Sequence, residues 1–524
     1  MAGKQDVAGV VSWVGLGLGP VLAVVAYVLL PGATLDDGGA VVSGLTQAGR
    51  ATAAIGVLMA VWWLTEAIPL SATSLVPLVA FPLCGCLSIR ASAAPYASDV
   101  IFLFLGGFIL GLGMERWGLH KRIALLTVRL VGTGPRRLIG GFMLASAVMS
   151  MWVSNTATTI MMLPIALSVI TLVAMRHAPE GTPSDQLRSP DPNFDSTLLL
   201  GIAYASSIGG VATLIGTAPN AIMRQVAADM VGKEIGFAQW MMLGVPLVAV
   251  MLPLAWVYMV FVSQPVRLKE IPGGKALIKG ELKALGPVRR GEWVVLCVFV
   301  CTVLLWVFKP VLNGIGQEHG WLVLMGLNDS SIAIMAALAL FLIPVKAGER
   351  TFAMDWRTAE RLPWGTLLLF GGGLSLAAAI SANGVDAYIG GMFQGLEGMP
   401  IWLMVLIITT VVIFLTELTS NTAVTTTLLP ILVAAAAAME GVDAMRLIVP
   451  AAVAASMAFM LPVATPPNAI VFGSGRVTIR EMGKAGIGLN LIGIVVITVL
   501  SMVAGDSILA VVGGGVGGGE TGGP

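Results

Sequence analysis

Long apolar runs separated by short polar islands extend along almost the whole chain. Many runs contain about 18 to 25 apolar residues, enough for a helix to cross a hydrocarbon core of roughly 30 Å. The pattern predicts about eleven crossings of a membrane. The expected helices lie at residues 11–30, 51–65, 69–88, 98–118, 196–230, 240–262, 292–309, 331–344, 364–382, 446–475 and 486–510.

Two of the polar islands have nearly the same sequence. Ser-Asn-Thr occurs at 154–156 and again at 420–422, 266 residues later. Each copy follows a hydroxyl residue by four positions, Ser150 in the first and Thr416 in the second. Several glycines repeat at the same offset, with Gly106, Gly107 and Gly118 matching Gly372, Gly373 and Gly384. The chain is therefore predicted to be an internal duplication.

A second pair of islands follows in the same order. Thr217-Ala218-Pro219-Asn220 in the first half matches Thr465-Pro466-Pro467-Asn468 in the second. Proline fits within an apolar helical run only as the first residue of a new helical segment. The expected helices 196–230 and 446–475 are therefore predicted to be broken near the middle of the membrane.

The apolar stretches on either side of each Ser-Asn-Thr are too short to be two separate crossings. They lie at 138–153 and 157–175 in the first half, and together within 402–438 in the second. A re-entrant hairpin fits better, because non-helical backbone at membrane depth survives only where protein or a water-filled cavity satisfies it. The predicted fold is an all-α polytopic membrane protein with two re-entrant hairpins and two broken helices.

The distribution of lysine and arginine predicts the orientation. Basic residues are grouped at 116–137, 267–290, 346–361 and 476–484, which the positive-inside rule places in the cytoplasm together with Lys4 and the N-terminus. Segment 119–137 is strongly basic, whereas its duplicate, 385–403, contains no lysine or arginine. The two copies should face opposite sides of the membrane, which is the inverted-topology repeat of secondary transporters. The C-terminus is then external.

These expectations divide the chain into five parts. They are an N-terminal helix and external loop (1–50), a first repeat with an inward-opening hairpin (51–262), a cytoplasmic linker (263–290), a second repeat with an outward-opening hairpin (291–510) and a glycine-rich tail (511–524). We expect run 11–30 to be a retained helix, because it is too long for a cleaved signal. The basic linker should be amphipathic on the membrane surface, and the tail should be disordered.

Composition supports the membrane class and excludes others. Hydrophobic residues make up 57% and charged residues 11% of the chain, whereas about 25% are charged in a soluble domain. No basic face is available to bind nucleic acid. The four cysteines lie within apolar runs, where thiols behave as small hydrophobes. The three histidines do not cluster, so an enzyme would lack its usual residues.

The Ser-Asn-Thr tips have a chemistry of their own. Where the chain leaves one helix and starts another, carbonyls at the first end and amide donors at the second are left free. The carbonyls, with hydroxyl and amide oxygens, suit Na⁺, and the amide donors and helix dipole suit a carboxylate. In the simpler alternative, these side chains only form hydrogen bonds with neighbouring helices. The duplication favours a binding site, while the repeated Gly-Gly pairs favour close packing.

Two acidic residues occur in apolar surroundings. Glu66 precedes Ala67-Ile68-Pro69, and Glu417 lies beside the second tip. Ionisable residues in a membrane often serve proton coupling. However, Glu66 is expected at a cytoplasmic helix end, where a solvated or capping carboxylate is ordinary. Glu417 has Met151 as its counterpart, so the duplication does not repeat the acid.

Three features carry a family resemblance. They are the stretch Trp62-Trp63-Leu64-Thr65-Glu66-Ala67-Ile68-Pro69, the two Ser-Asn-Thr motifs and Thr465-Pro466-Pro467-Asn468. Over nearly its whole length the sequence resembles the divalent anion/sodium symporter family, and within it the bacterial sodium-dependent dicarboxylate transporters. The resemblance implies a homodimer in the cell membrane that couples Na⁺ to uptake of dicarboxylate or tricarboxylate anions by an elevator motion.

The resemblance also implies the site residues. One Na⁺ site would involve Ser150, Ser154, Asn155 and Gly216, and another Thr416, Thr419, Ser420, Asn421 and Ala464. The substrate carboxylates would contact Asn155, Thr156, Asn421, Thr422, Thr465 and Pro466. The two halves differ where Ala218 replaces Pro466 and where Thr158 replaces Val424. The choice among succinate, malate, fumarate, 2-oxoglutarate, citrate and sulfate therefore stays open.

Other functions remain to be compared with symport. Some proteins of this kind resemble Na⁺-independent exchangers, which is the nearest alternative. A membrane scaffold or an ion channel belongs to a different class, but a channel would not need two broken helices and two sealed tips. An enzyme would need a polar catalytic cluster, which the sequence does not show.

Overall fold

The computed structural model describes residues 2–35, 41–132, 134–177, 189–271, 273–346, 348, 350–392, 398–439 and 441–503. The predicted tail 511–524 lies outside these residues. The described part is built from α-helices, with two short antiparallel strand pairs. These pair β1 (Thr34–Leu35) with β2 (Val41–Ser43), and β3 (Pro344–Lys346) with β4 (Thr351–Phe352). The prediction of an all-α polytopic membrane protein is confirmed.

The first half contains one hairpin and one broken helix. The helices before the hairpin are α1 (Ala2–Leu29), α2 (Gln47–Thr65), α3 (Leu70–Thr73), α4 (Val76–Leu83), α5 (Ile89–Ala93), α6 (Asp99–Trp117) and α7 (Leu119–Val131). The hairpin arms are α8 (Pro135–Ser150) and α9 (Asn155–His177), and the broken helix is α10 (Pro192–Gly210) with α11 (Ala218–Val231). Helix α12 (Phe237–Val257) continues as a π-helical segment, Tyr258–Ser263, and the linker forms α13 (Gly274–Ala284).

The second half repeats this order. Its first helices are α14 (Arg290–His319), α15 (Leu322–Met325), α16 (Asp329–Leu342), α17 (Trp356–Ala359), α18 (Trp364–Ala382) and α19 (Val385–Met392). The hairpin arms are α20 (Ile401–Thr416) and α21 (Asn421–Ala437). The second broken helix is α22 (Met445–Ala454) with α23 (Pro466–Gly473), and α24 (Ile479–Val503) follows.

Eight stretches of the described residues are long and apolar enough to cross a membrane. Seven coincide with predicted crossings, and the eighth, Asn155–Arg176, is the second arm of the first hairpin. The predicted helix 331–344 corresponds to the shorter apolar helix α16. Of the remaining predicted crossings, 196–230 and 446–475 are interrupted, as expected from their Pro-Asn motifs.

The predicted helix at 69–88 is found only over 70–83, and turn residues Ser74 and Leu75 interrupt it between α3 and α4. The chain bends at Ser74 between α3 and α4, where the Tyr96 hydroxyl donates to the Ser74 carbonyl. A side chain at Gly372 would lie 2.6 Å from the Ser74 carbonyl oxygen. The bend therefore follows from contacts with distant segments, which a hydrophobic pattern does not contain.

The predicted end of helix 292–309 is also wrong, because α14 continues through Pro310 to His319. Proline removes one backbone hydrogen bond from a helix. Side chains on either side of Pro310 attach α14 to the chain near the start of α16. Trp306 Nε1 donates to the Asp329 carbonyl at 3.0 Å, and Asn313 Nδ2 donates to the Leu327 carbonyl at 3.3 Å.

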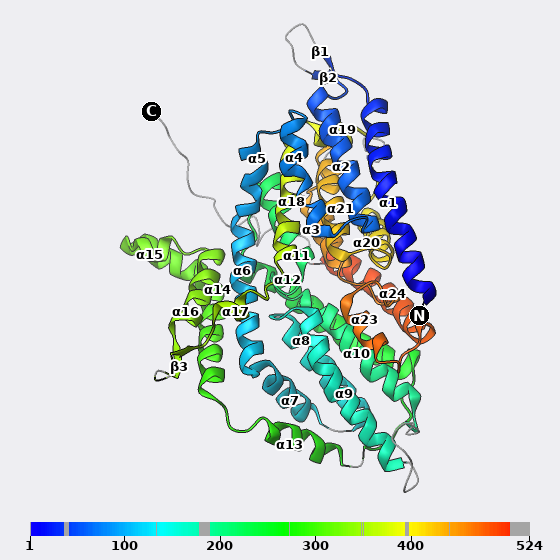
Figure 1. The fold of residues 1–524 in the computed structure, drawn as a ribbon, viewed down its shortest axis with the longest axis vertical. Helices are drawn as coiled ribbons and strands as arrows, with labels where there is room; N and C mark the ends of the chain where they lie inside the picture. Colours follow the sequence, from blue (N-terminus) through cyan, green and yellow to red (C-terminus); the bar gives the residue numbers. More distant parts are fainter. Residues whose placement is uncertain are drawn as a thin grey trace.

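The two hairpins lie at opposite ends of the molecule. Figure 1 shows α8 and α9 in the lower half and α20 and α21 in the upper half. The helices that precede them, α7 and α19, both follow a left-handed glycine, Gly118 with φ 73° and Gly384 with φ 67°. This arrangement agrees with an inverted repeat, which stays a prediction, as do the five-part division and the membrane side of each terminus.

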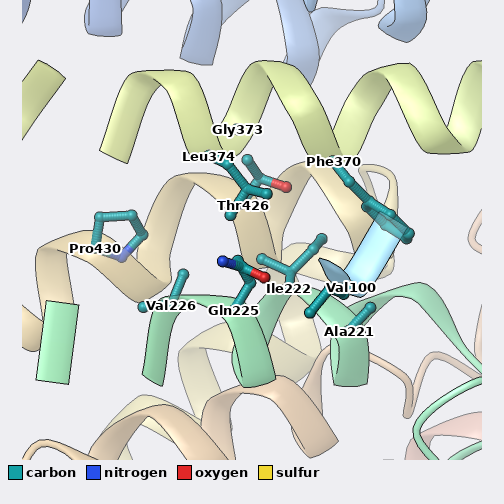
Figure 2. Close-up of a pocket in the computed structure, with 10 residues that line it drawn as sticks. All are labelled: Val100, Ala221, Ile222, Gln225, Val226, Phe370, Gly373, Leu374, Thr426 and Pro430. Atoms are coloured by element: carbon teal, nitrogen blue, oxygen red, sulfur yellow. The ribbon is translucent and has the colours of Figure 1, made fainter. Parts of the chain in front are cut away.

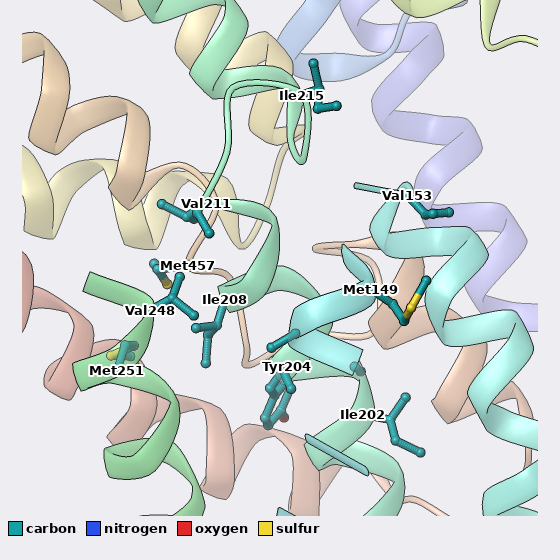
Figure 3. Packing of buried hydrophobic residues seen from close by; sticks show 14 of the residues in the cluster. Met149, Val153, Ile202, Tyr204, Ile208, Val211, Ile215, Val248, Met251 and Met457 are labelled. Atoms are coloured by element: carbon teal, nitrogen blue, oxygen red, sulfur yellow. The ribbon is translucent and has the colours of Figure 1, made fainter. Parts of the chain in front are cut away.

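Helix α10 lies at the centre of the largest core. Every residue from Phe194 to Gly210 is buried. A side chain at Gly209 would lie 2.3 Å from the Ala147 carbonyl oxygen, so the backbones of α8 and α10 approach very closely, as small residues allow in membranes. Figure 3 shows part of this core, including Met149, Val153, Tyr204, Ile208, Val211, Val248, Met251 and Met457.

The repeated Gly-Gly pairs lie at close helix contacts, as predicted. A side chain at Gly106 would lie 2.5 Å from the Ala333 carbonyl carbon on α16, and one at Gly373 would lie 2.3 Å from Thr426 Cγ2 on α21. Both distances are shorter than a normal van der Waals contact. These glycines therefore determine how closely the helices pack.

The inverted repeat predicts that α7 and α19 face opposite sides of the membrane. Single cysteines at the exposed positions Arg129 and Ala387, in a variant without native cysteines, should react with an impermeant thiol reagent from opposite sides of oriented vesicles. Labelling of both cysteines from the same side would contradict the inverted repeat.

Candidate cation and anion site

The first hairpin tip joins the end of α8 to the start of α9. The buried Ser150 hydroxyl donates to Oδ1 of Asn155, the first residue of α9. Ser154 Oγ accepts from the Ala157 amide at 3.3 Å, and Thr156 is half-buried beside it. The Thr213 hydroxyl donates to the Met151 carbonyl. The tip is thereby attached to the break between α10 and α11.

The first break is closed by the asparagine of its Pro-Asn motif. Buried Asn220 donates through Nδ2 to three carbonyls in the break, those of Gly210 (3.3 Å), Val211 (3.2 Å) and Thr213 (2.7 Å). Its Oδ1 accepts no hydrogen bond from the described residues. Carbonyls that would be left free where a helix stops are thus satisfied.

Two glycines allow a close approach of the chain beside the first tip. A side chain at Gly210 would lie 2.6 Å from Asn155 Oδ1 and 3.1 Å from the Gly216 carbonyl oxygen. A side chain at Gly216 would lie 2.3 Å from the Gly210 carbonyl oxygen. An amide oxygen and two carbonyl oxygens therefore lie close together around these glycines. Such oxygens from unwound helices are the usual ligands of Na⁺ in transporters.

The second tip gathers three oxygens around Thr416. Thr416 Oγ1 lies 2.6 Å from Asn421 Oδ1 and 3.0 Å from the Ala455 carbonyl oxygen. One hydroxyl carries a single proton, so it cannot donate fully to both acceptors. Thr416 and Ala455 are buried and Asn421 is half-buried, and such a group of acceptors suits a cation.

The other predicted residues of the second site lie in the tip, in the first turn of α21 and in the second break. Thr419 Oγ1 donates to the Leu415 carbonyl at 3.0 Å. Ser420 is the N-cap of α21 without a side-chain capping bond, and half-buried Thr422 lies in its first turn. Ala464 is buried within the second break.

The second break has the same construction as the first. Asn468 Nδ2 donates to the carbonyls of Ala458 (3.2 Å) and Leu461 (3.0 Å), and its Oδ1 accepts no hydrogen bond from the described residues. Thr465 is the N-cap of α23 and accepts from the Asn468 amide at 3.3 Å. Pro466 is the exposed first residue of that helix.

The two halves meet at their breaks. Thr217 Oγ1 lies 3.5 Å from Ser456 Oγ, 239 residues away in the sequence. Thr217 follows Gly216 and Ser456 follows Ala455, so this contact joins the two groups of oxygens. The hairpin arms also cross between halves, since α9 packs against α23 and α21 against α11. Within the part of the chain that the structure describes, the polar contacts in these groups involve no lysine or arginine.

Glu417 closes the second break. This buried carboxylate accepts from the amides of Phe459 (2.6 Å), Met460 (2.8 Å) and Leu461 (3.1 Å), and from Asn490 Nδ2 at 2.8 Å. All four partners are donors, so the hydrogen-bonding needs of the two carboxyl oxygens are met within the protein. These contacts give Glu417 a structural role. Glu66 is exposed at the C-terminal end of α2, as expected of a solvated carboxylate.

Several residues of the site were not identified from the sequence. Asn220 and Asn468 belong to the duplicated motif but were not assigned to the site, although an asparagine after each helix-starting proline was a usable signal. Thr213, Ala455 and Ser456 carried no such signal. Their positions depend on contacts between distant segments.

Comparison with known proteins identifies the family. The profile of the sodium:sulfate symporter transmembrane region matches residues 39–511. The chain belongs to the sodium:sulfate symporter family. It is 43% identical over 488 residues to the sodium-dependent dicarboxylate transporter SdcS of Staphylococcus saprophyticus, covering 93% of this chain and 90% of the relative. It is 41% identical over 485 residues to SdcS of Staphylococcus aureus, covering 92% and 89%.

Two solved structures share the fold of this sodium:sulfate symporter family member. They are the YdaH transporter of Alcanivorax borkumensis (TM-score 0.55, 12% identity, covering 95% of this chain and 98% of that one) and MtrF of Neisseria gonorrhoeae (TM-score 0.55, 11% identity, covering 94% and 96%). Membership of the family makes this protein a multi-pass membrane transporter and not an enzyme.

Proposed function

We propose that this protein is a secondary active transporter that couples Na⁺ entry to the uptake of dicarboxylate anions. The observation that carries the proposal is the pair of oxygen groups at the two tips, joined through Thr217 and Ser456 without a basic side chain. The similarity to SdcS, named as sodium-dependent dicarboxylate transporters, supports the same cation and substrate class.

Each tip would hold one Na⁺. The first ion would lie among Ser150, Ser154, Asn155 and Gly216, where Asn155 Oδ1 and the Gly216 carbonyl oxygen both lie close to Gly210. The second would lie among Thr416, Thr419, Ser420, Asn421 and Ala464, next to the oxygens around Thr416. At least two coupling ions are therefore proposed.

The anion would lie between the tips. Helices α9, α21 and α23 begin at Asn155, Asn421 and Pro466, and a helix N-terminus attracts carboxylates through free amide donors and its dipole. The proposed substrate contacts are Asn155, Thr156, Asn421, Thr422, Thr465 and Pro466. Succinate, malate and fumarate fit a site with donors on two sides. Citrate would need room for a third carboxylate.

We further propose an elevator motion within an inverted repeat. The two hairpins, the two broken helices, α12 and α24 pack mainly on one another and contain all the proposed ligands. They would move as one body against the remaining helices. Homodimerisation, a cytoplasmic N-terminus and an external C-terminus in the plasma membrane are part of the same proposal.

Uptake into proteoliposomes tests the function and ranks substrates. Labelled succinate, malate, fumarate, citrate and sulfate would each be supplied with and without an inward Na⁺ gradient. We expect C4 dicarboxylates to enter fastest and only with the gradient. Sulfate is the second candidate substrate, because the family description names it. Fast uptake without Na⁺, accelerated by internal dicarboxylate, would instead identify an exchanger.

A further inference from the structure

A network of charged residues lies outside the proposed site. Arg224 on α11 contacts two carboxylates, with Nη2 at 3.3 Å from Asp99 Oδ2 and 3.9 Å from Asp329 Oδ2. Lys309 Nζ on α14 lies 2.7 Å from Asp329 Oδ1. Asp99 and Asp329 are the first residues of α6 and α16, where the helix dipole favours an acid. The four charges balance.

Most of this network is removed from solvent. Arg224 is 8% exposed and Asp329 is 1% exposed, whereas the side chain of Asp99 is 57% exposed. The Phe237 amide, at the start of α12, also donates to Asp329 Oδ2 at 2.9 Å. Removing charges of this kind from water is costly unless they are paired. The network therefore holds its helices in one particular arrangement.

The ion pairs connect two groups of helices that otherwise share few polar contacts. Helix α11 begins at the first break, and Asn220 lies one turn before Arg224 on it. Helices α6 and α16 pack against each other and against α14, and they contain none of the proposed ligands. Arg224 thus attaches the helix of the site to helices outside it.

The surface between these groups is apolar and incompletely filled. Figure 2 shows a small cavity bordered by Val100 of α6, by α18 and by the site helices α11 and α21. The rest of its lining consists of Ala221, Ile222, Gln225, Val226, Phe370, Gly373, Leu374, Thr426 and Pro430. Helices can slide past each other along an apolar surface of this kind without breaking hydrogen bonds or ion pairs. The ion pairs of Arg224 are specific and must break if α11 moves past α6 and α16.

We propose that Arg224, Asp99 and Asp329 form a latch that stabilises this conformation of the transporter and opens during each transport cycle. The inference rests on the proposed function, because the motion across the latch is the elevator step. The latch reduces exchange between conformations, and its strength sets the fraction of molecules in this one.

Pulsed electron paramagnetic resonance on the full-length protein tests the latch. Nitroxides on cysteines at Met335 (α16) and Lys484 (α24), with the native cysteines replaced, report the position of one group of helices relative to the other. The population at the distance of this structure should fall about two- to fivefold in Asp99→Asn, as expected for an ion pair with a half-exposed partner. Arg224→Gln should lower it further, while Asp329 keeps Lys309 as its partner.

Arg116→Gln is the matched control, since Arg116 on α6 pairs at 2.6 Å with Asp355, the N-cap of α17, and both residues belong to the helices outside the site. Arg116→Gln should leave the distance distribution unchanged. An equal shift in all three variants, or no shift in Asp99→Asn and Arg224→Gln, would overturn the latch.

Uptake by the same preparations separates the latch proposal from the proposed transport function. Unchanged distances with intact Na⁺-driven uptake contradict only the latch, whereas the predicted shift without uptake contradicts only the transport function.

Discussion

Replacing Thr416 by alanine should raise the Na⁺ concentration for half-maximal uptake about tenfold or more, the scale on which loss of one partner weakens a metal site. Thr416 Oγ1 is the oxygen that connects Asn421 Oδ1 to the Ala455 carbonyl, so its removal opens the proposed cation shell. Ser150→Ala should act similarly at the first tip, where its hydroxyl bonds Asn155 Oδ1. Uptake rates measured against Na⁺ concentration check both expectations.

Matched hydroxyls elsewhere in the hairpins separate cation binding from helix stability. Thr410 on α20 and Ser168 on α9 bond only the carbonyl one turn earlier, those of Leu406 and Pro164. Thr410→Ala and Ser168→Ala should leave the Na⁺ dependence unchanged, and Thr416→Ser should restore it. Equal Na⁺ dependence in Thr416→Ala and Thr410→Ala would reduce Thr416 to a packing contact.

The sequence was most informative where polar residues interrupt apolar runs. Ser-Asn-Thr and Pro-Asn located both hairpin tips and both breaks within a few residues, because a polar backbone at membrane depth needs special residues. Helix ends governed by distant contacts were missed. The pattern did not reveal the bend at Ser74 or the continuation of α14 through Pro310.

The candidate site was predictable in its ligand types but not in its assembly. The duplicated motifs contain Thr416 and Asn421, whose contact spans five residues. The contact between Thr217 and Ser456 joins segments 239 residues apart, and Asn220 closes its break through three carbonyls. Such pairings result from folding of the two halves against each other. Local propensities and spacing do not specify them.

Anion binding should require Na⁺. The helix N-termini at the proposed site contribute roughly 0.3 to 2 kcal/mol each, whereas removing a carboxylate from water costs several kcal/mol. Among the described residues, the polar contacts at the tips include no lysine or arginine. Bound Na⁺ would supply the missing positive charge and fix the tip backbone. The coupling should reach at least about 1 to 3 kcal/mol, roughly 5- to 150-fold in affinity, and be reciprocal.

Thermal unfolding of the purified protein measures this coupling directly. Succinate would be titrated in NaCl and in choline chloride at equal ionic strength, and the rise in Tm recorded at each concentration. Because a ligand of the folded state raises its stability by mass action, Na⁺-coupled binding predicts a clear rise in NaCl and almost none in choline chloride. Equal stabilisation by succinate in the two salts would contradict coupled transport.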